Sequence, residues 1–247
     1  MERLAAHLSD WIHDTVTAGG GVGAVLGLSG GLDSAVVAAL CKRAFPDHTT
    51  GVIMPCESDP GDAEDGRLTA RHFGVAQATV DLSPIYRALC EQLHAGCSEI
   101  PGDRLAGANI KPRLRMTTLY AFANHLDYRV VGTGNRSELA VGYFTKWGDG
   151  GVDLLPLGNV TKTQVRDLAR HLGVPQRIID KPPSAGLWAG QTDEGEIGVT
   201  YEELDACLEG RGGQAARQTV ARLGAASRHK RELPPVAPLP PGESDST

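Results

Sequence analysis

Gly27-Leu28-Ser29-Gly30-Gly31-Leu32-Asp33-Ser34 is the stretch that decides the fold of this 247-residue chain. The apolar segment 22–28 is typical of a buried parallel strand, and 35–45 carries apolar residues at helical spacing. The pattern therefore predicts a strand, a tight glycine turn and a helix. Paired glycines let backbone N–H groups approach an anion, and the first helical turn directs its unpaired N–H groups and positive dipole end to the same place. With hydroxyl donors from Ser29 and Ser34, the stretch is interpreted as a phosphate-binding loop.

This loop differs from two common phosphate-binding motifs. A Walker loop places Gly-Lys before its Ser or Thr, whereas Asp33 precedes Ser34 here. A dinucleotide fingerprint would need a third glycine where Leu26 stands. A carboxylate beside phosphates repels them unless a cation lies between, so Asp33 predicts bound Mg²⁺. A helix-capping acid after a glycine turn is the alternative interpretation of Asp33 taken alone.

Composition narrows the class of protein. The chain is 41% hydrophobic and 22% charged, with a net charge of −6, which argues against a nucleic-acid-binding surface. Five cysteines without a Cys-x-x-Cys pair predict free thiols. The sequence has no apolar run long enough to span a bilayer and no apolar signal segment after Met1. We therefore expect a cytoplasmic protein with neither nucleic acid nor membrane as a partner.

Short strands and helices alternate along the first half of the chain. Further strands are predicted at 51–54, 76–82 and 129–133, and helices at 1–18, 59–73, 84–94 and 111–126, with an irregular link at 96–109. This alternation predicts an α/β fold, a Rossmann-like doubly wound parallel sheet flanked by helices. Ligands bind such sheets at the carboxyl ends of the strands, where the phosphate loop and Thr133 both fall.

The second half carries helix signals and two segments of another kind. Capping boxes predict helices over 161–171 and 200–208, and a last helix is expected at 213–228. Segment 181–198 has no periodicity, and we expect it to be a functional loop that closes over bound substrates. The Pro-rich end predicts a disordered tail. The expected organisation is one domain over 1–232, including an N-terminal helix at 1–18, and a tail at 233–247.

Two glycine-containing stretches carry candidate binding groups. Glu138, at the end of 132–138, is a candidate second metal ligand opposite Asp33. Lys146 and Asp153 lie in a glycine-rich stretch that would suit a charged, hydroxyl-rich substrate. Each has a plainer interpretation, a loop with a capping Asn for the first and a solvated surface loop for the second.

The succession of these motifs resembles the NAD⁺ synthetase family, within the ATP pyrophosphatase superfamily and its adenine nucleotide alpha hydrolase-like fold. The resemblance runs in order over roughly 20–231. It is carried by Ser-Gly-Gly-Leu-Asp-Ser at 29–34, Lys-Pro-Arg-Leu-Arg-Met at 111–116, Gly-Thr-Gly-Asn-Arg-Ser-Glu at 132–138, Gly-Tyr-Phe-Thr-Lys-Trp-Gly-Asp at 142–149, Leu-Pro-Leu at 155–157, Lys-Pro-Pro-Ser-Ala-Gly-Leu at 181–187, Gln-Thr-Asp-Glu at 191–194 and His-Lys-Arg at 229–231. Together these blocks are far more specific than any single motif.

The resemblance implies an activity and the residues that serve it. In that family ATP adenylates deamido-NAD⁺, and ammonia then amidates the adenylate. The implied ATP-binding residues are Gly27, Leu28, Ser29, Gly30, Gly31, Leu32, Asp33, Ser34, Thr133, Lys162 and Ser184, with Asp33 and Lys162 as catalytic groups and Asp33 and Glu138 as Mg²⁺ ligands. The implied deamido-NAD⁺ residues are Arg113, Lys146, Asp153, His229 and Lys230. The family also implies a homodimer, for which the apolar faces at 4–12 and 114–126 are candidate interfaces.

Some residues depart from the family's usual pattern. Pro112 stands where Ala is common, and Ser184 stands where Thr is frequent. Gly134-Asn135 replaces the Asp-His of many ammonia-using bacterial members. None of these changes removes a charged group that the chemistry needs.

Three other functions stay open at this point. A tRNA-thiolating pyrophosphatase would carry basic patches and reactive cysteine pairs, which the sequence does not show. A GMP-synthetase-like ligase and a catalytically idle nucleotide-binding module also share the phosphate loop. The idle module fits poorly because Asp33, Glu138, Lys146 and Lys162 are all present.

Free ammonia is the expected nitrogen source. Only about 26 residues precede the phosphate loop, far fewer than a glutaminase domain needs. The five cysteines are scattered through the expected synthetase domain. A separate glutaminase subunit is a possible supplier of ammonia.

Overall fold

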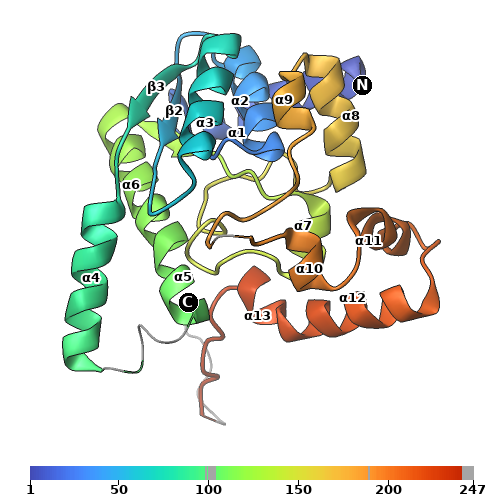
Figure 1. The fold of residues 1–247 in the computed structure, drawn as a ribbon. Helices are drawn as coiled ribbons and strands as arrows, with labels where there is room; N and C mark the ends of the chain where they lie inside the picture. Colours follow the sequence, from blue (N-terminus) through green and yellow to red (C-terminus); the bar gives the residue numbers. More distant parts are fainter. Residues whose placement is uncertain (98, 100–103, 189, 241–247) are drawn as a thin grey trace.

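Four parallel strands form the central sheet of the computed structural model, which describes residues 1–97, 99, 104–188 and 190–240. They lie in the order β3-β2-β1-β4 (Figure 1). The strands are β1 (Gly23–Gly27), β2 (Thr49–Ile53), β3 (Ala76–Thr79) and β4 (Tyr128–Val130). From β1 the chain adds β2 and β3 on one side and then crosses to β4 on the other. The strand order therefore reverses at β1, which makes the carboxyl end of β1 and β4 the topological switch point.

Helices cover both faces of this sheet, so the predicted α/β fold is confirmed. One face carries α1 (Glu2–Ala18), α2 (Leu32–Ala44), α3 (Pro60–Phe73), α8 (Lys162–Leu172) and the short α9 (Gln176–Ile179). The other carries α4 (Ser83–Gly96), the short α5 (Arg104–Ala108) and α6 (Ile110–Leu126). Alternate residues of β1 enter the two cores, with Leu26 on the α2 side and Val25 on the α6 side.

A smaller helical lobe lies beside the carboxyl end of the sheet. It consists of α7 (Arg136–Val141), α10 (Asp193–Ile197), α11 (Tyr201–Leu208), α12 (Gln214–Ala226) and α13 (Arg228–Arg231). Its core joins Val141, Ile197, Tyr201 and Leu204. Figure 1 shows α10, α11 and α12 grouped below the sheet layers. The lobe thus forms one wall at the end of the sheet where ligands bind.

Most predicted elements are confirmed, and the described residues also contain short helices that the sequence did not predict, α5, α9, α10 and α13. Segment 181–198 contains α10, whose signal was a Thr followed by acids in the first turn. The link 96–109 contains α5. Trp11 belongs to the apolar segment 4–12 but is 38% exposed. The side of α1 that faces the core carries Ala5, Leu8, Ile12 and Val16.

The expected tail lies only partly within the described chain. Residues 234–240 contain neither helix nor strand, and 241–247 lie outside the described residues. The division into a domain at 1–232 and a tail at 233–247 stays a prediction. Among the described helices, none combines the length and the apolar character needed to cross a membrane.

Gly142, at the end of α7, packs directly against Ser227 at the start of α13. It ends α7 with φ +68°, and a Cβ atom there would lie 2.1 Å from Cβ of Ser227, the residue before α13. Gly173 ends α8 with a similar φ of +75°, but nothing lies within 4 Å of its Cβ position. The two glycines share a backbone conformation and differ in packing.

Gly142→Ala is therefore expected to destabilise the protein more than Gly173→Ala. The left-handed conformation alone costs about 1 kcal/mol for either alanine. At Gly142 the clash with Ser227 adds about 1–3 kcal/mol. Urea denaturation of the two variants measures the difference, and equal losses would show that the Ser227 contact does not constrain this turn.

Candidate active site at the carboxyl end of the sheet

The phosphate loop leaves β1 and enters α2 through a tight turn. Gly30 has φ +79°, and a Cβ atom there would lie 2.3 Å from the Asp62 carbonyl oxygen of α3. Ser34 Oγ donates to the Gly31 carbonyl at 2.9 Å, and Ser29 Oγ donates to Ser34 Oγ at 3.1 Å. Within the described residues no side chain caps the first turn of α2. Its N–H groups are thus suited to an anion.

Asp33 is the centre of a charged cluster beside this loop. Lys162 at the start of α8 donates from Nζ to Asp33 Oδ2, and its Nζ lies 3.4 Å from Glu138 Oε1. Asn135 Nδ2 donates to the other Asp33 oxygen at 3.0 Å. The cluster brings together residues from α2, α7 and α8, including all three of the predicted metal and catalytic residues.

The short helix α7 sets the position of Glu138. Asn135 caps α7 by accepting from the Glu138 backbone N–H at 3.0 Å, while Glu138 Oε2 accepts from the Asn135 N–H at 3.2 Å. This capping box leaves Oε1 of Glu138 to face Lys162. The capping interpretation and the cluster interpretation of this stretch therefore hold together, because Asn135 serves both.

Burial shifts the pKa values of this cluster. It raises the pKa of Glu138 to about 7, against the opposing effect of the Lys162 ammonium. Burial alone lowers the pKa of Lys162, but the charges of Asp33 and Glu138 outweigh that effect and raise it above its ordinary value. Lys162 thus stays charged and acts as the counter-ion of both carboxylates.

Tyr201 and Asp193 complete the wall of the cluster and were not singled out from the sequence. Tyr201 OH donates to Asp193 Oδ2 at 3.0 Å and lies 3.4 Å from Glu138 Oε1, while the Lys162 ammonium lies 5.0 Å from the Tyr201 ring centroid. Burial raises the pKa of Asp193. The available signals were the 191–194 block and the capping Thr200, which place these residues on α10 and α11.

The arrangement of Asp33 and Glu138 fits a divalent cation. Both carboxylates already converge on one positive charge, the Lys162 ammonium. No group of three or more His, Cys, Asp or Glu side chains in the described chain forms a metal cage. Two carboxylates, with substrate phosphates and water as the remaining ligands, form the usual environment of protein-bound Mg²⁺.

Three of the residues expected to hold deamido-NAD⁺ meet at a second place. Arg113 Nη2 donates to the Lys146 carbonyl at 3.4 Å, and Lys146 Nζ donates to the His229 carbonyl. Lys146 also lies 5.3 Å from the centroid of the Trp147 ring, which is half exposed. The structure thus joins α6, the loop after α7 and α13 around exposed cationic groups.

Lys230 and Asp153 are occupied by contacts within the protein. Lys230 Nζ donates to the carbonyls of Gly142 and Phe144, each at 2.8 Å, and burial lowers its pKa. Asp153 accepts from the Val130 N–H at 2.8 Å and from Tyr120 OH at 3.0 Å. Both side chains fix the backbone of the loops that they join.

Thr133 and Ser184 are the other residues that are expected to contact ATP. Thr133 is half-buried in the loop that follows β4. Ser184 is exposed, and its Oγ accepts from the Gly186 N–H at 3.1 Å. The Ser184 hydroxyl thus accepts a hydrogen bond within a local turn and keeps its own hydrogen as a donor.

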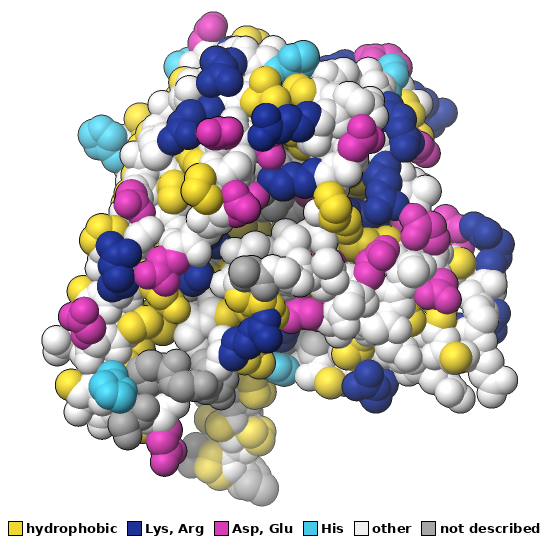
Figure 2. Space-filling model, in the orientation of Figure 1, with side chains coloured by type: hydrophobic (Ala, Val, Ile, Leu, Met, Phe, Trp, Pro, Cys, Tyr) yellow, Lys and Arg dark blue, Asp and Glu magenta, His cyan; other side chains and the backbone are white. Residues whose placement is uncertain are grey.

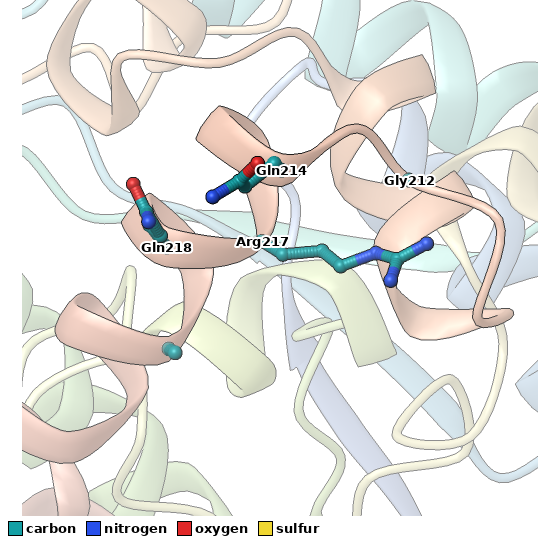
Figure 3. A pocket seen from close by; sticks show the side chains of 5 residues that line it. Gly212, Gln214, Arg217 and Gln218 are labelled. Carbon is teal, nitrogen blue, oxygen red and sulfur yellow. The ribbon is translucent and has the colours of Figure 1, made fainter.

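A surface hollow lies beside α12. Gly212, Gln214, Arg217, Gln218 and Ala221 line it, and Figure 3 shows Arg217 extending away from Gln214 and Gln218. Arg217 donates to the Gly210 carbonyl at 3.2 Å. Among the described residues that line the hollow, Arg217 is the one charged side chain. Figure 2 shows cationic and acidic side chains interspersed over the face in view.

Comparison with known proteins identifies the family of the chain. The sequence model of the NAD synthase family matches residues 4–234. The chain belongs to the NAD synthase family. It is 52% identical to the NH3-dependent NAD⁺ synthetase of Carboxydothermus hydrogenoformans, over 96% of this chain and 98% of that protein. The family resemblance inferred from the sequence motifs is thereby confirmed.

Solved structures of this family superpose closely on the chain. An NMN synthetase from Francisella tularensis has a TM-score of 0.91 and 37% identity, covering 96% of this chain and 98% of that one. An NH3-dependent NAD synthetase from Campylobacter jejuni has a TM-score of 0.79 and 26% identity, covering 96% and 99%. The Rossmann-like fold is therefore that of the NAD synthase family.

The buried cluster predicts unequal costs for two cations of α8. Lys162→Met is expected to lower the free energy of unfolding by about 3–5 kcal/mol, because Asp33 and Glu138 then lose their shared counter-ion. Arg166→Met, which removes an ion pair with the exposed Glu202, is expected to cost less than about 1 kcal/mol. Urea denaturation in EDTA measures both values. Equal costs would contradict the central place given to Lys162.

Proposed function

We propose that this chain amidates deamido-NAD⁺ to NAD⁺ with ammonia, consuming ATP and releasing AMP and pyrophosphate. The observation that carries the proposal is the convergence of Asp33, Glu138 and Lys162 beside an uncapped phosphate loop. The extensive similarity to NH3-dependent NAD⁺ synthetases supports it. The reaction makes a carbon–nitrogen bond and so belongs to the ligases.

The substrate must be activated because a carboxylate reacts poorly with ammonia. Its leaving group would be oxide. In the first step a carboxylate oxygen attacks the α-phosphorus of ATP, and the bond from that phosphorus to the bridging oxygen breaks. Pyrophosphate leaves with the electron pair, and a mixed anhydride with AMP remains. The N–H groups of the phosphate loop and α2 would hold the departing pyrophosphate.

The charged cluster supplies the electrostatics of this step. Mg²⁺ held by Asp33 and Glu138 would neutralise the charge that gathers on the phosphates. Lys162 would direct its ammonium toward the α-phosphate, because it lies at the end of the loop and stays charged. Thr133 and Ser184 would contact ATP at the rim of the site. The chain needs no nucleophilic side chain, since the substrate carboxylate attacks.

Ammonia completes the reaction at the carbonyl carbon. Its lone pair forms the new carbon–nitrogen bond, AMP leaves with the electrons of the broken carbon–oxygen bond, and a proton is released. Arg113, Lys146, Asp153, His229 and Lys230 would orient deamido-NAD⁺, with Asp153 and Lys230 acting mainly by fixing the surrounding loops. Segment 181–198 would exclude water from the adenylate, whose hydrolysis would waste ATP.

A homodimer is the proposed assembly. Leu4, Leu8 and Ile12 of the segment 4–12 pack into the core of the chain, so only Trp11 of its large apolar side chains remains exposed for an interface. In contrast α4 buries none of its residues and exposes Ile85 and Leu89. A second copy of the chain packed on α4 and the neighbouring α6 would cover this apolar surface.

A second candidate function is the amidation of the deamido form of NMN. The observation that favours it is the high TM-score to the Francisella tularensis NMN synthetase. Both reactions act on the same pyridine carboxylate and use the same phosphate loop. They differ only in whether the substrate carries an adenylate half.

One assay separates these functions. The purified chain with ATP, Mg²⁺ and ammonium is expected to make NAD⁺ from deamido-NAD⁺, with pyrophosphate release that depends on that substrate. Glutamine free of ammonia is expected not to replace ammonium. Higher kcat/KM with deamido-NMN would assign the second function. Pyrophosphate release without either substrate, or comparable product from glutamine, would contradict the proposal.

Asp33→Asn tests the proposed metal ligand. The variant is expected to keep its fold and to lose about a hundredfold to a thousandfold of its pyrophosphate release, because it removes the negative charge that holds the cation. Asp47→Asn, beyond the opposite end of α2, is the matched control and should retain activity. Near-normal turnover of folded Asp33→Asn at limiting Mg²⁺ would remove Asp33 from the metal site.

A further inference from the structure

Lys181 occupies the point where segment 181–198 leaves the sheet layers. Its Nζ lies 2.8 Å from Asp62 Oδ1 and 2.8 Å from Asp65 Oδ2, both on α3. The Asp65 side chain is only 5% exposed and that of Lys181 30%. Burial by itself lowers the pKa of Lys181, but its hydrogen bonds to the two acids raise it above the ordinary value. The ammonium is thus charged and held from two sides.

The same part of α3 supports the phosphate loop. The place of a Cβ atom on Gly30 is filled by the Asp62 carbonyl oxygen at 2.3 Å and by Asp65 Cβ at 2.9 Å. The Gly30 carbonyl oxygen also lies 3.5 Å from Lys181 Nζ. Lys181 therefore contacts the carbonyl side of the loop and leaves the N–H groups of the loop free for a ligand.

The turn around Ser184 lies beside Asp62, one of these two acids. It starts at Lys181 and returns to α3 at Gly186, whose Cβ position lies 3.4 Å from Asp62 Oδ2. Ser184 lies between these two points. Asp62 thus binds Lys181 on one side of a residue that is expected to bind ATP and lies close to Gly186 on the other side.

We propose that Lys181 is a positioning residue that holds the phosphate loop and the Ser184 turn in one fixed arrangement through Asp62 and Asp65. Lys181 would affect phosphate binding indirectly, by fixing the positions of Gly30 and Ser184. Preorganised donors bind a phosphate more tightly than donors that must first be ordered. The inference rests on the proposed function, because it takes the loop to bind ATP phosphates.

Pyrophosphate binding in the presence of Mg²⁺, measured by calorimetry, tests this role. Lys181→Met is expected to raise the dissociation constant about tenfold, a loss typical of coupled contacts. Lys181→Arg should restore most of the affinity, because it keeps the charge. Arg177→Met is the matched control: Arg177 Nε on α9 also lies 2.9 Å from Asp65 Oδ1, but within the described part of the chain Arg177 pairs with acids of α3 and not with Gly30 or the Ser184 turn. It should bind as the wild type does.

Steady-state kinetics provide a second measurement. Lys181→Met is expected to raise the KM for ATP while leaving the KM for deamido-NAD⁺ within about twofold, since the effect is confined to the phosphate loop and the Ser184 turn. A general loss of stability would change both constants. If Lys181→Met does not fold, Lys181→Arg and Asp62→Asn still provide the test.

Asp62→Asn distinguishes positioning from direct contact. It weakens the hold on Lys181, so pyrophosphate affinity should fall, though less than in Lys181→Met. Tighter binding would mean that the freed ammonium contacts phosphate itself, which overturns the positioning role. Unchanged affinity in Lys181→Met would overturn it as well. Wild-type protein that fails to bind pyrophosphate would overturn the proposed function along with the inference.

Discussion

The ion pair of Lys162 with Asp33 and Glu138 is the interaction on which the site depends. It joins the first turns of α2 and α8 to α7, and it is almost wholly removed from water, since the Lys162 side chain is 4% exposed. Two carboxylates at one place would repel each other without a cation. The fold therefore keeps a cation at this point, whether it is the ammonium alone or the ammonium together with a metal ion.

The conformation of the phosphate loop depends on Gly30 and on two acids of α3, Asp62 and Asp65. The chain turns sharply at Gly30 because α3 fills the space a side chain would need. Asp62 and Asp65 then attract Lys181, so the helix that restricts the loop also fixes the start of the following segment. The N–H groups of the loop and of α2 consequently face one direction. The backbone supplies the anion site, and the side chains keep it in place.

Local signals were sufficient for the fold and for the phosphate loop. The strand-turn-helix around Gly30 and the capping boxes at Thr161 and Thr200 are decided within a few residues, and the structure agrees with them. The approach of Lys162 to Asp33 was expected only through resemblance, because the two are far apart in sequence. The roles of Tyr201 and of Lys181 depend on how the helical lobe and α3 meet the sheet. No local pattern encodes such contacts, and so sequence reasoning missed them.

The residues of the charged cluster are far apart in the sequence, so they are synthesised at different times. Asp33 meets Asn135 across 102 positions and Lys162 across 129, while Glu138 reaches Tyr201 across 63. When the ribosome has translated the phosphate loop, Asp33 is present but its counter-ion Lys162 has not yet been made. Long-range contacts of this kind form late, after much of the chain has been released. The charged cluster can therefore form only after Lys162, about two thirds of the way along the chain, has been synthesised.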